Sequence, residues 1–236
     1  INEYASYNKP IEIINITIPK KVAIYSCNFG NYRNEMLNGL DNGNFNIHFD
    51  YYFYTDNINL RSNYWRIIIH PLEKSDDISN SYRWTSKKIK WCLPEKLNEY
   101  KTIIWLDSKC LSCKNNIDIE YLNNHYYNDN NKILFWKHPN RSTCKEEIDI
   151  TVALGLENVN NAVKFKNKIK DFSSPIPLPD TCYIIRSTDI QTTNLFSHVY
   201  HFLKLYGLKR DQNIINYAIY DYKYNINCIK FLTTLP

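Results

Sequence analysis

Short apolar runs alternate along the chain with longer stretches in which apolar residues recur every three or four positions. The first pattern predicts buried strands, and the second predicts amphipathic helices. Strands are predicted over 21–27, 48–54, 64–69, 101–106, 132–136, 182–185 and 226–231. Helices are predicted from 79 to about 93 and over 117–127, 146–154, 159–170, 190–205 and 211–220. This alternation predicts an α/β fold built around a central sheet.

Turn signals divide these elements without indicating a second domain. Pro94 marks a helix boundary, and the Pro-rich stretch over 173–179 predicts an extended loop. We expect a single domain over 1–236, with an N-terminal extension over 1–20 and a core over about 21–231. Because the chain does not begin with Met, we also expect it to be part of a longer protein.

The composition excludes several classes of protein. Hydrophobic residues make up 44% of the chain and aromatic residues 15%, which is too much apolar material for a disordered protein. The five glycines form neither G-x-G-x-x-G nor G-x-x-x-x-G-K-[ST], which excludes the glycine-rich dinucleotide fingerprint and the P-loop.

The net charge of +5 suits an anionic small molecule. The lysines are spread along the chain, so we expect no nucleic-acid partner.

The seven cysteines indicate a reducing compartment. Their odd number and scattered positions do not form a disulfide framework, and we therefore expect a cytoplasmic location. Cys110 and Cys113 have C-x-x-C spacing, but no second pair lies at zinc-finger distance, so packing is the favoured interpretation. The sequence has no window of eighteen apolar residues, and we expect no membrane span.

Charged or basic side chains follow three of the predicted strands. Asp56 follows the second strand, Asp107 the fourth and His138 the fifth. Ligands of open α/β sheets bind beyond the carboxyl ends of the strands. These residues are therefore candidate ligand contacts, although each also fits a turn or a helix cap.

One predicted helix has three cations at helical spacing. Arg83, Lys87 and Lys90 stand at i, i+4 and i+7, so a helix places them on one face. Such a face is either a solvated basic stripe or a grip for a diphosphate.

An acidic residue opens the last predicted helix, in the segment Arg210-Asp211-Gln212. An aspartate in a first helical turn matches the helix dipole. The same placement keeps the carboxylate ionised and available as a general base. A structural ion pair between Asp211 and Arg210 or Arg186 is the alternative interpretation.

Several short motifs resemble, in the same order, those of one family. The segment Trp105-Leu106-Asp107-Ser108-Lys109 resembles the W-[IV]-D-G-K signature of a glycosyltransferase-like family of plants, bacteria and large DNA viruses, long described as a domain of unknown function. The segment Asn28-Phe29-Gly30-Asn31-Tyr32 is similar to F-G-x-Y, Tyr54-Thr55-Asp56 is similar to F-T-D, and the spacing from Lys90 to Asp107 equals that from K-x-L-P-H to W-x-D. His138-Pro139-Asn140-Arg141 is similar to H-P-x-R, and Glu147 stands where an E follows that motif. Residues 180–186 are similar to E-G-C-V-I-L-R, Asn194-Leu195-Phe196 to N-L-F, and Arg210-Asp211-Gln212 to R-D-Q. The resemblance covers about residues 21–222, and its specificity lies in the order of the motifs.

This resemblance implies a GT-A-type nucleotide-diphospho-sugar transferase fold, with a mixed, mostly parallel central sheet flanked by helices. It implies a hexosyl- or deoxyhexosyltransferase that moves a sugar from a nucleotide-diphospho-sugar to a glycan or another hydroxyl acceptor. We expect the donor to be a UDP-sugar. The resemblance also implies that Asp107 approaches the diphosphate through a divalent metal, Mn²⁺ or Mg²⁺.

The expected site residues fall into three groups. Those on the nucleotide-sugar side are Tyr25, Cys27, Phe29, Tyr32, Asp56, Arg83, Lys87, Lys90, Asp107 and Lys109. Those on the sugar and acceptor side are His138, Arg141, Arg186, Asn194, Arg210 and Gln212. The catalytic candidates are Asp211, as the base of an inverting displacement, and Glu147.

One position departs from the general GT-A metal motif D-x-D, because Lys109 stands where the second aspartate is expected. Mg²⁺ and Mn²⁺ prefer several oxygen ligands, and one carboxylate with a diphosphate supplies few of them. Lys109 either competes with a metal for the diphosphate or forms an ion pair with Asp107. The same lysine favours an alternative function, a non-catalytic carbohydrate-binding or assembly module that kept the fold.

Overall fold

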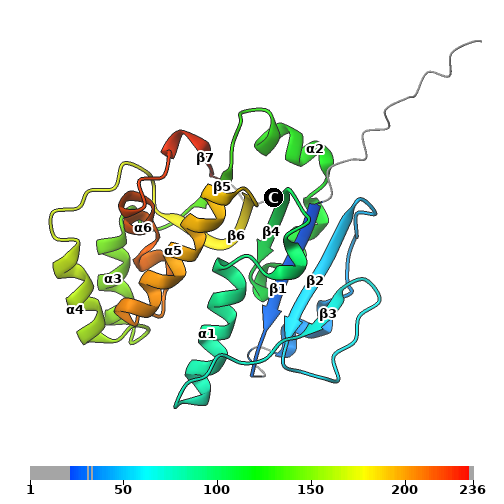
Figure 1. Cartoon of the computed structure of the whole chain (residues 1–236), viewed down its shortest axis with the longest axis horizontal. Helices are drawn as coiled ribbons and strands as arrows, with labels where there is room; N and C mark the ends of the chain where they lie inside the picture. The colour runs from blue at the N-terminus through cyan, green and yellow to red at the C-terminus, as the bar shows by residue number, and fades with distance from the viewer. Residues whose placement is uncertain (1–21, 31, 33, 234–236) are drawn as a thin grey trace, which may run out of the picture.

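The strands form one sheet through the middle of the molecule. The computed structural model describes residues 22–30, 32 and 34–233, so the predicted extension over 1–20 lies outside the described residues (Figure 1). The strands are β1 (Val22–Asn28), β2 (Phe49–Thr55), β3 (Arg66–Ile69), β4 (Thr102–Leu106), β5 (Ile133–Lys137), β6 (Pro179–Ser187) and β7 (Ile229–Leu232). Their order across the sheet is β3-β2-β1-β4-β6-β5-β7. β6 is antiparallel to β4 and β5, and the other neighbouring pairs are parallel. The predicted mixed, mostly parallel sheet is therefore confirmed.

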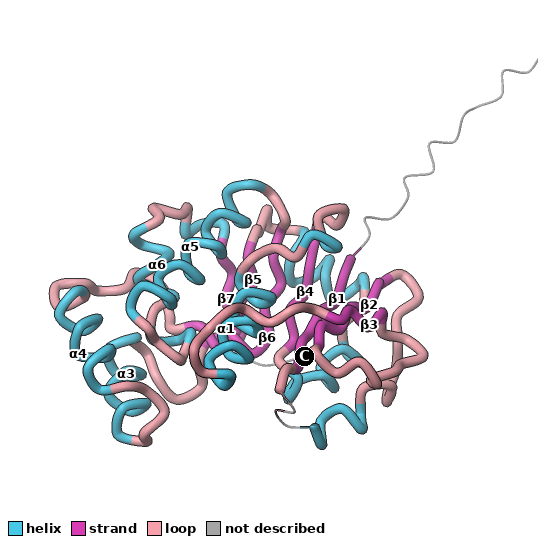
Figure 2. The backbone as a smooth tube through the Cα atoms, turned by 60° about the horizontal axis from the view of Figure 1, so that its bottom comes forward, coloured by secondary structure: helices cyan, strands magenta, loops and turns pink. Residues whose placement is uncertain are grey.

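Helical segments cover both faces of this sheet. The α-helices in the described part of the chain are α1 (Ile78–Trp91), α2 (Ile119–Leu122), α3 (Cys144–Ala153), α4 (Val159–Lys168), α5 (Ile190–Tyr206) and α6 (Ile215–Asp221). The strands run side by side behind α1, and α3 and α4 lie together at one end of the molecule (Figure 2). None of the described helices is both long and apolar enough to cross a membrane.

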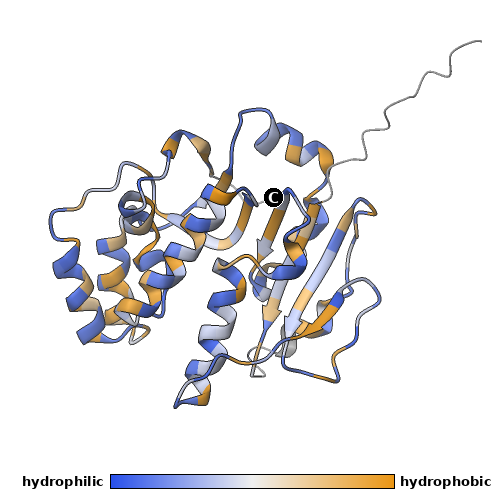
Figure 3. Cartoon of the chain, viewed as in Figure 1, coloured by the Kyte–Doolittle hydropathy of each residue, from blue (hydrophilic) through white to orange (hydrophobic). Residues whose placement is uncertain are grey.

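The alternation of side chains along β1 explains the two layers. Successive side chains of a strand point to opposite faces of the sheet. Ala23 and Tyr25 belong to the core beneath α1 and α5, whereas Val22 and Ile24 belong to the core on the other face, with α2. All four are fully buried, and the helices that flank the sheet carry both hydrophobic and hydrophilic residues along their length (Figure 3). Burial on both faces accounts for the nearly continuous apolar runs of the central strands.

Two predicted helices are shorter or more broken than the sequence pattern suggests. The helix predicted over 117–127 consists of α2 and one π-helical turn over Asn123–Tyr127. The helix predicted over 211–220 is a 3₁₀ turn over Asp211–Asn213 followed by α6. The break lies at Ile214, where φ is −125° and ψ is −23°. Asp211 therefore sits in a separate tight turn before α6.

Two strands also differ from their predictions. β6 extends beyond the predicted 182–185 in both directions, because it pairs with β4 on one side and β5 on the other. The strand predicted over 226–231 begins with a 3₁₀ turn over Ile226–Cys228, and β7 follows that turn. The remaining strands begin and end within about two residues of their predicted bounds.

β1 and β4 lie side by side at the centre of the sheet and end at the same edge. From β1 the chain adds β2 and β3 on one side, and it then returns to place β4 on the other side of β1. A reversal of this kind leaves a crevice beyond the carboxyl ends of the two strands, where ligands of α/β sheets bind.

Candidate functional site

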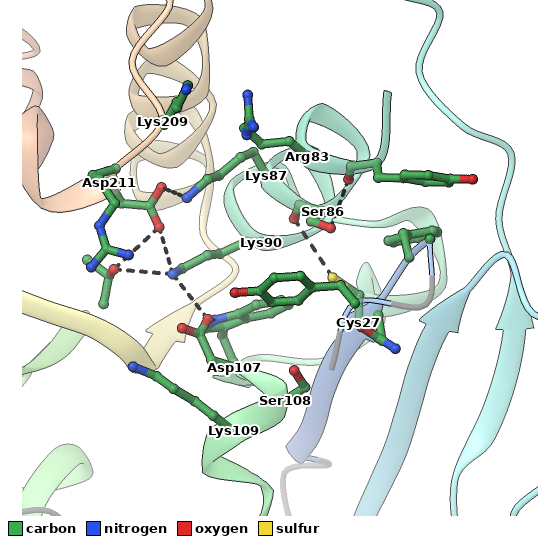
Figure 4. Close-up of a pocket in the computed structure, with 18 of the residues that line it drawn as sticks. Cys27, Arg83, Ser86, Lys87, Lys90, Asp107, Ser108, Lys109, Lys209 and Asp211 are labelled. Carbon is green, nitrogen blue, oxygen red and sulfur yellow. Dashed lines mark hydrogen bonds and ion pairs between the residues drawn. The ribbon is translucent and has the colours of Figure 1, made fainter. Parts of the chain in front are cut away.

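A cavity of about 600 Å³ lies beyond the carboxyl ends of β1 and β4 (Figure 4). Its wall consists of the ends of β1 and β4 with the loops that follow them, one face of α1, Leu156, Thr181 of β6 and the segment over 209–212. Its volume is within the range of small-molecule sites, about 300–1,000 Å³. Segments far apart in the sequence thus meet at the edge of the sheet where the topology predicts a ligand.

The cavity is strongly cationic. Among the described residues that line it, the cations are Arg83, Lys87, Lys90, Lys109, Lys209 and Arg210, and the carboxylates are Asp107 and Asp211. Six cations against two carboxylates leave a surplus of four positive charges. A concave site with such a surplus concentrates anions from solution.

The basic face of α1 points into the cavity, as the spacing of Arg83, Lys87 and Lys90 predicts (Figure 4). The helix begins at its cap Asp77, whose side chain accepts a hydrogen bond from the backbone N–H of Ser79 at 2.9 Å. It is held against the sheet by its buried apolar residues, and its opposite face therefore turns toward the cavity. The prediction of one shared cationic face is confirmed.

Lys90 lies at the centre of a buried charge cluster. Its Nζ is 2.7 Å from Oδ2 of Asp211 and 3.3 Å from Oδ1 of Asp107, and it donates to Oγ1 of Thr181 at 3.2 Å. Burial would lower the pKa of Lys90, but the carboxylates of Asp107 and Asp211 outweigh it and raise the pKa above its usual value. The Lys90 ammonium is therefore charged at every physiological pH.

Asp211 is enclosed by lysines on both sides. Lys87 pairs with Oδ1 of Asp211, and Lys90 pairs with Oδ2 (Figure 4). Burial alone would raise the pKa of Asp211, but the charges of Lys87 and Lys90 hold it well below its usual value. The partners of Asp211 are thus two lysines of α1, whereas the alternative interpretation of the sequence named Arg210 or Arg186.

This arrangement leaves Asp211 a weak proton acceptor. Its side chain is 3% exposed, and Thr181 also donates to Oδ2 at 3.3 Å. A general base works best when its pKa lies near the operating pH, and the pKa of Asp211 is shifted in the opposite direction. While the two lysines hold it, Asp211 serves as their counter-ion.

Asp107 is the more accessible of the two carboxylates. Its backbone N–H donates to the carbonyl of Cys182 in β6 at 2.7 Å, which fixes the residue at the end of β4. Its Oδ1 accepts a hydrogen bond from Nε1 of Trp105 at 2.8 Å, in addition to the contact with Lys90. The Asp107 side chain is 32% exposed, so it remains within reach of a molecule in the cavity.

The loop after β1 forms the opposite wall, and Gly30 sets its shape. Gly30 has φ +65°, and a Cβ atom there would lie 2.3 Å from the ring of Tyr82 in α1. The carboxylate of Asp56 accepts a hydrogen bond from the Gly30 N–H at 3.1 Å. Phe29 and Tyr32 line the cavity from this loop. Asp56 itself does not line it and supports the loop from outside, in contrast to its predicted ligand contact.

The segment over 209–212 is held by Glu157, a residue that no sequence pattern singles out. Glu157 is 4% exposed, and its Oε2 accepts hydrogen bonds from the backbone N–H groups of Lys209 at 2.8 Å and Arg210 at 3.2 Å. The same oxygen accepts a bond from Nδ2 of Asn213 at 3.0 Å. Glu157 therefore fixes the turn that presents Asp211 to α1. Lys209 and Thr181 are further lining residues that sequence reasoning missed, although Lys209 directly precedes the R-D-Q segment.

Several predicted acceptor-side residues lie away from the cavity. His138 is buried after β5, and its Nδ1 accepts hydrogen bonds from the N–H groups of Asn140 at 3.2 Å and Arg141 at 3.1 Å. Arg141 pairs with the fully buried Glu147. This cluster holds the turn between β5 and α3. Asn194 is exposed on α5. None of these residues lines the cavity, contrary to the prediction that they share it.

Two further predicted residues lie beneath the cavity. Arg186 is 1% exposed, and it donates to the hydroxyl of Tyr25 at 3.2 Å and to the carbonyl of Trp91 at 3.3 Å. The Tyr25 hydroxyl donates in turn to the carbonyl of Lys90 at 3.1 Å. Both side chains lie in the core, where they support the last turn of α1. Neither lines the cavity, so the predicted contact of these residues with the sugar donor or acceptor is not seen. Cys27, Arg210 and Gln212 line the cavity as expected.

The donor atoms around Asp107 do not fit Mn²⁺ or Mg²⁺. These ions prefer about six oxygen ligands. Asp211 has both oxygens committed to lysines, and Lys109 occupies the second position of the predicted metal motif. Within the described residues, no three His, Cys, Asp or Glu side chains come together in a group able to hold a metal ion.

Neither a comparison with protein-family models nor a comparison with curated proteins found a match to this chain. The motifs and the geometry of the cavity are therefore the observations that bear on its function.

Proposed function

We propose that this protein is a glycosyltransferase that moves a sugar from a nucleotide-diphospho-sugar, with UDP as the carrier, to a hydroxyl group of a glycan or another acceptor. The observation behind this proposal is the cationic cavity at the carboxyl ends of β1 and β4. A nucleotide-diphospho-sugar needs a concave site with an aromatic wall for the nucleoside and a cationic wall for the diphosphate. Both walls are present in this cavity.

The two walls suggest how the donor lies. Tyr32 offers aromatic surface on the β1 side, where a nucleoside can stack, because this residue is 64% exposed, whereas the neighbouring Phe29 is buried in the core. Arg83 and Lys87 offer guanidinium and ammonium groups on the α1 side, where a diphosphate accepts charge-assisted hydrogen bonds. The mostly parallel sheet with its flanking helices agrees with the GT-A-type fold that the motifs imply.

The proposed chemistry is stabilisation of the leaving group. Negative charge grows on the diphosphate as the bond to the sugar breaks, and preorganised cations aimed at that charge lower the barrier. Lys87 and Lys90 are held in place before the donor arrives, since Asp211 pairs with both. Little reorganisation is then needed during the reaction.

The proposed role of Asp211 as the base of an inverting displacement depends on the donor. A bound diphosphate competes with Asp211 for Lys87, and the pKa of the carboxylate rises toward its ordinary value when a lysine turns away from it. Asp211 would gain basicity only in the donor complex. Glu147, the other catalytic candidate, is fully buried against Arg141 and outside the cavity, which makes it the weaker choice.

The commitment of Asp211 to two lysines also favours one alternative. A carbohydrate-binding or assembly module without turnover would keep such ion pairs permanently, because no step would need a free carboxylate. Hydrolysis of the donor in the absence of an acceptor distinguishes the two functions. A transferase is expected to release UDP slowly from UDP-sugars, whereas a binding module is not.

A thermal-shift screen of nucleotides and nucleotide sugars tests the proposal directly. A ligand present at a hundred times its Kd stabilises the native state by about 2.7 kcal/mol. We expect UDP and at least one UDP-sugar to raise Tm, and we expect Lys87→Met to reduce this effect. Lys88→Met is the matched control, because Lys88 lies on the same helix, pairs with Glu73 and does not line the cavity. Absence of stabilisation by every nucleotide and nucleotide sugar would overturn the proposal.

A further inference from the structure

The cations of the cavity occupy the place where a divalent metal would act. Lys87 and Lys90 project from successive turns of α1, and Lys109 follows Asp107 after β4 (Figure 4). We term these three residues the lysine cluster. All three line the same cavity. We infer that the lysine cluster replaces a divalent cation, so that the cavity binds the diphosphate of its donor without metal. This inference rests on the proposed function.

The cavity offers few free oxygen ligands to a metal ion. A hexacoordinate Mg²⁺ on a donor diphosphate still needs several further oxygen atoms, of which protein carboxylates supply at least one or two. Asp211 is 3% exposed and already neutralises two ammonium groups. Only Asp107, of the two lining carboxylates, has a substantially exposed side chain, and its Oδ1 already accepts from Trp105 and Lys90.

The positive charges beside Asp107 would also repel a metal ion. The Nζ of Lys90 lies 3.3 Å from Oδ1 of Asp107. A metal bound to that oxygen, at the usual distance of about 2.1 Å, would lie within roughly 5.5 Å of the Lys90 charge. Lys109 adds a further cation two residues after Asp107. In a partly buried site such like-charge repulsion is weakly screened, and it opposes metal binding.

The three lysines differ in how many of their hydrogen-bond donors are already used within the protein. Lys90 is fixed by three acceptors, Asp107, Asp211 and Thr181, which account for its three donors. Lys87 pairs with Asp211 alone among the described residues, so its ammonium retains donors for phosphate oxygens. Lys109 is exposed, and its side chain lies apart from Asp211 (Figure 4). The lysine cluster thus combines one fixed charge with two ammonium groups that reach a ligand.

Isothermal titration calorimetry with UDP, GDP, CDP, ADP and inorganic pyrophosphate tests the inference. Each probe is titrated in EDTA and again in MnCl₂. We expect at least one nucleoside diphosphate to bind in EDTA, with an affinity that Mn²⁺ changes by less than about tenfold, which is 1.4 kcal/mol. We expect Lys87→Met to weaken that metal-free binding by about tenfold or more, since it removes a charge-assisted hydrogen bond. Lys88→Met is expected to leave the affinity unchanged.

The exposed Lys109 permits a second test that does not depend on the buried lysines. Lys109→Asp restores the D-x-D pattern and removes one competing charge, so this variant is expected to lose affinity in EDTA and regain it in MnCl₂. Binding of the unaltered protein only in the presence of Mn²⁺ would overturn the inference while leaving the proposed function intact. Equal affinities of Lys87→Met and the unaltered protein would also overturn it. If no probe binds in either buffer, both proposals are wrong.

Discussion

Replacing Asp211 with asparagine tests the charge cluster on which the cavity depends. Asp211→Asn keeps the size of the side chain and one of its two acceptor atoms, and it removes the charge. Lys87 and Lys90 then lack their shared counter-ion. Both lysines stay largely buried, since the Lys90 side chain is 5% exposed and the Lys87 side chain 18% exposed. Removing one partner of a buried ion pair costs about 3–5 kcal/mol.

The expected loss is large enough to measure by thermal unfolding. For a chain of this size, 1 kcal/mol corresponds to about 2–4 °C, so Tm at pH 7 should fall by on the order of 10 °C. Asp149→Asn is the matched control. Asp149 pairs with Lys166 on the surface and is 62% exposed, so we expect no measurable change in Tm.

The pH dependence gives an independent check of the same cluster. The two lysines lower the pKa of Asp211 in the folded state, so the ionised carboxylate stabilises the fold. This contribution is fully present above the ordinary aspartate pKa of about 3.9 and is lost as the pH falls through the lowered pKa of the folded state. The difference in stability between the unaltered protein and Asp211→Asn should therefore be constant near neutrality and shrink in strong acid.

The variant also separates the counter-ion role from the base role. Loss of a base alone lowers turnover by about 10²–10⁴ and leaves donor affinity unchanged. Loss of the counter-ion frees the Lys87 ammonium and one donor of Lys90 for phosphate, so UDP and pyrophosphate should bind Asp211→Asn more tightly and raise its Tm by a larger amount. A Tm within about 2 °C of the unaltered protein would refute the assignment of Asp211 as the partner of two buried lysines.

Three further substitutions probe other parts of the site. Asp107→Ala should lower transfer, measured by UDP release, because it removes one of the two carboxylates that hold Lys90. Circular dichroism should show an intact fold, and a loss of soluble protein would instead assign Asp107 a structural role. Gly30→Ala should lower stability by about 1–3 kcal/mol in urea unfolding, because φ is +65° and the new Cβ meets Tyr82. Glu157→Gln should reduce donor affinity in calorimetry, although Glu157 does not line the cavity, because it weakens the hydrogen bonds from the backbone N–H groups of Lys209 and Arg210. An unchanged affinity would exclude this positioning role.

Local patterns were sufficient to predict the strands and the cationic wall. The apolar runs of β1 and β4 reflect burial on both faces of the sheet, which a sequence displays directly. The spacing of Arg83, Lys87 and Lys90 reflects the 3.6-residue period of a helix, so their common face was predictable before their surroundings were known. Asp107 was identified by its position at a strand end.

The order of the strands was not predictable in this way, and it decides which strand ends share the cavity. His138 follows β5, but β6 lies between β4 and β5 in the sheet. Neighbouring strands are about 4.8 Å apart, so β5 lies roughly 10 Å from β4 across the sheet. The ends of the two strands are also offset along β6, where Lys137 pairs with Pro179 and Leu106 with Tyr183. His138, Arg141 and Glu147 consequently form their own cluster. Sequence patterns report only neighbours along the chain, and they therefore also missed the partners of Asp211, since Lys87 lies 124 positions earlier in the chain.

A cavity that binds a diphosphate faces an electrostatic problem when it is empty. The cations that bind the ligand repel one another, and burying them without partners would destabilise the fold. In this chain one buried carboxylate, Asp211, pairs with both Lys87 and Lys90 and thereby keeps the empty cavity intact. Under the proposed function, a diphosphate competes with that carboxylate for Lys87, so donor binding and the basicity of Asp211 would be thermodynamically linked. Under the proposed function, this linkage would delay proton abstraction from an acceptor until a donor is bound.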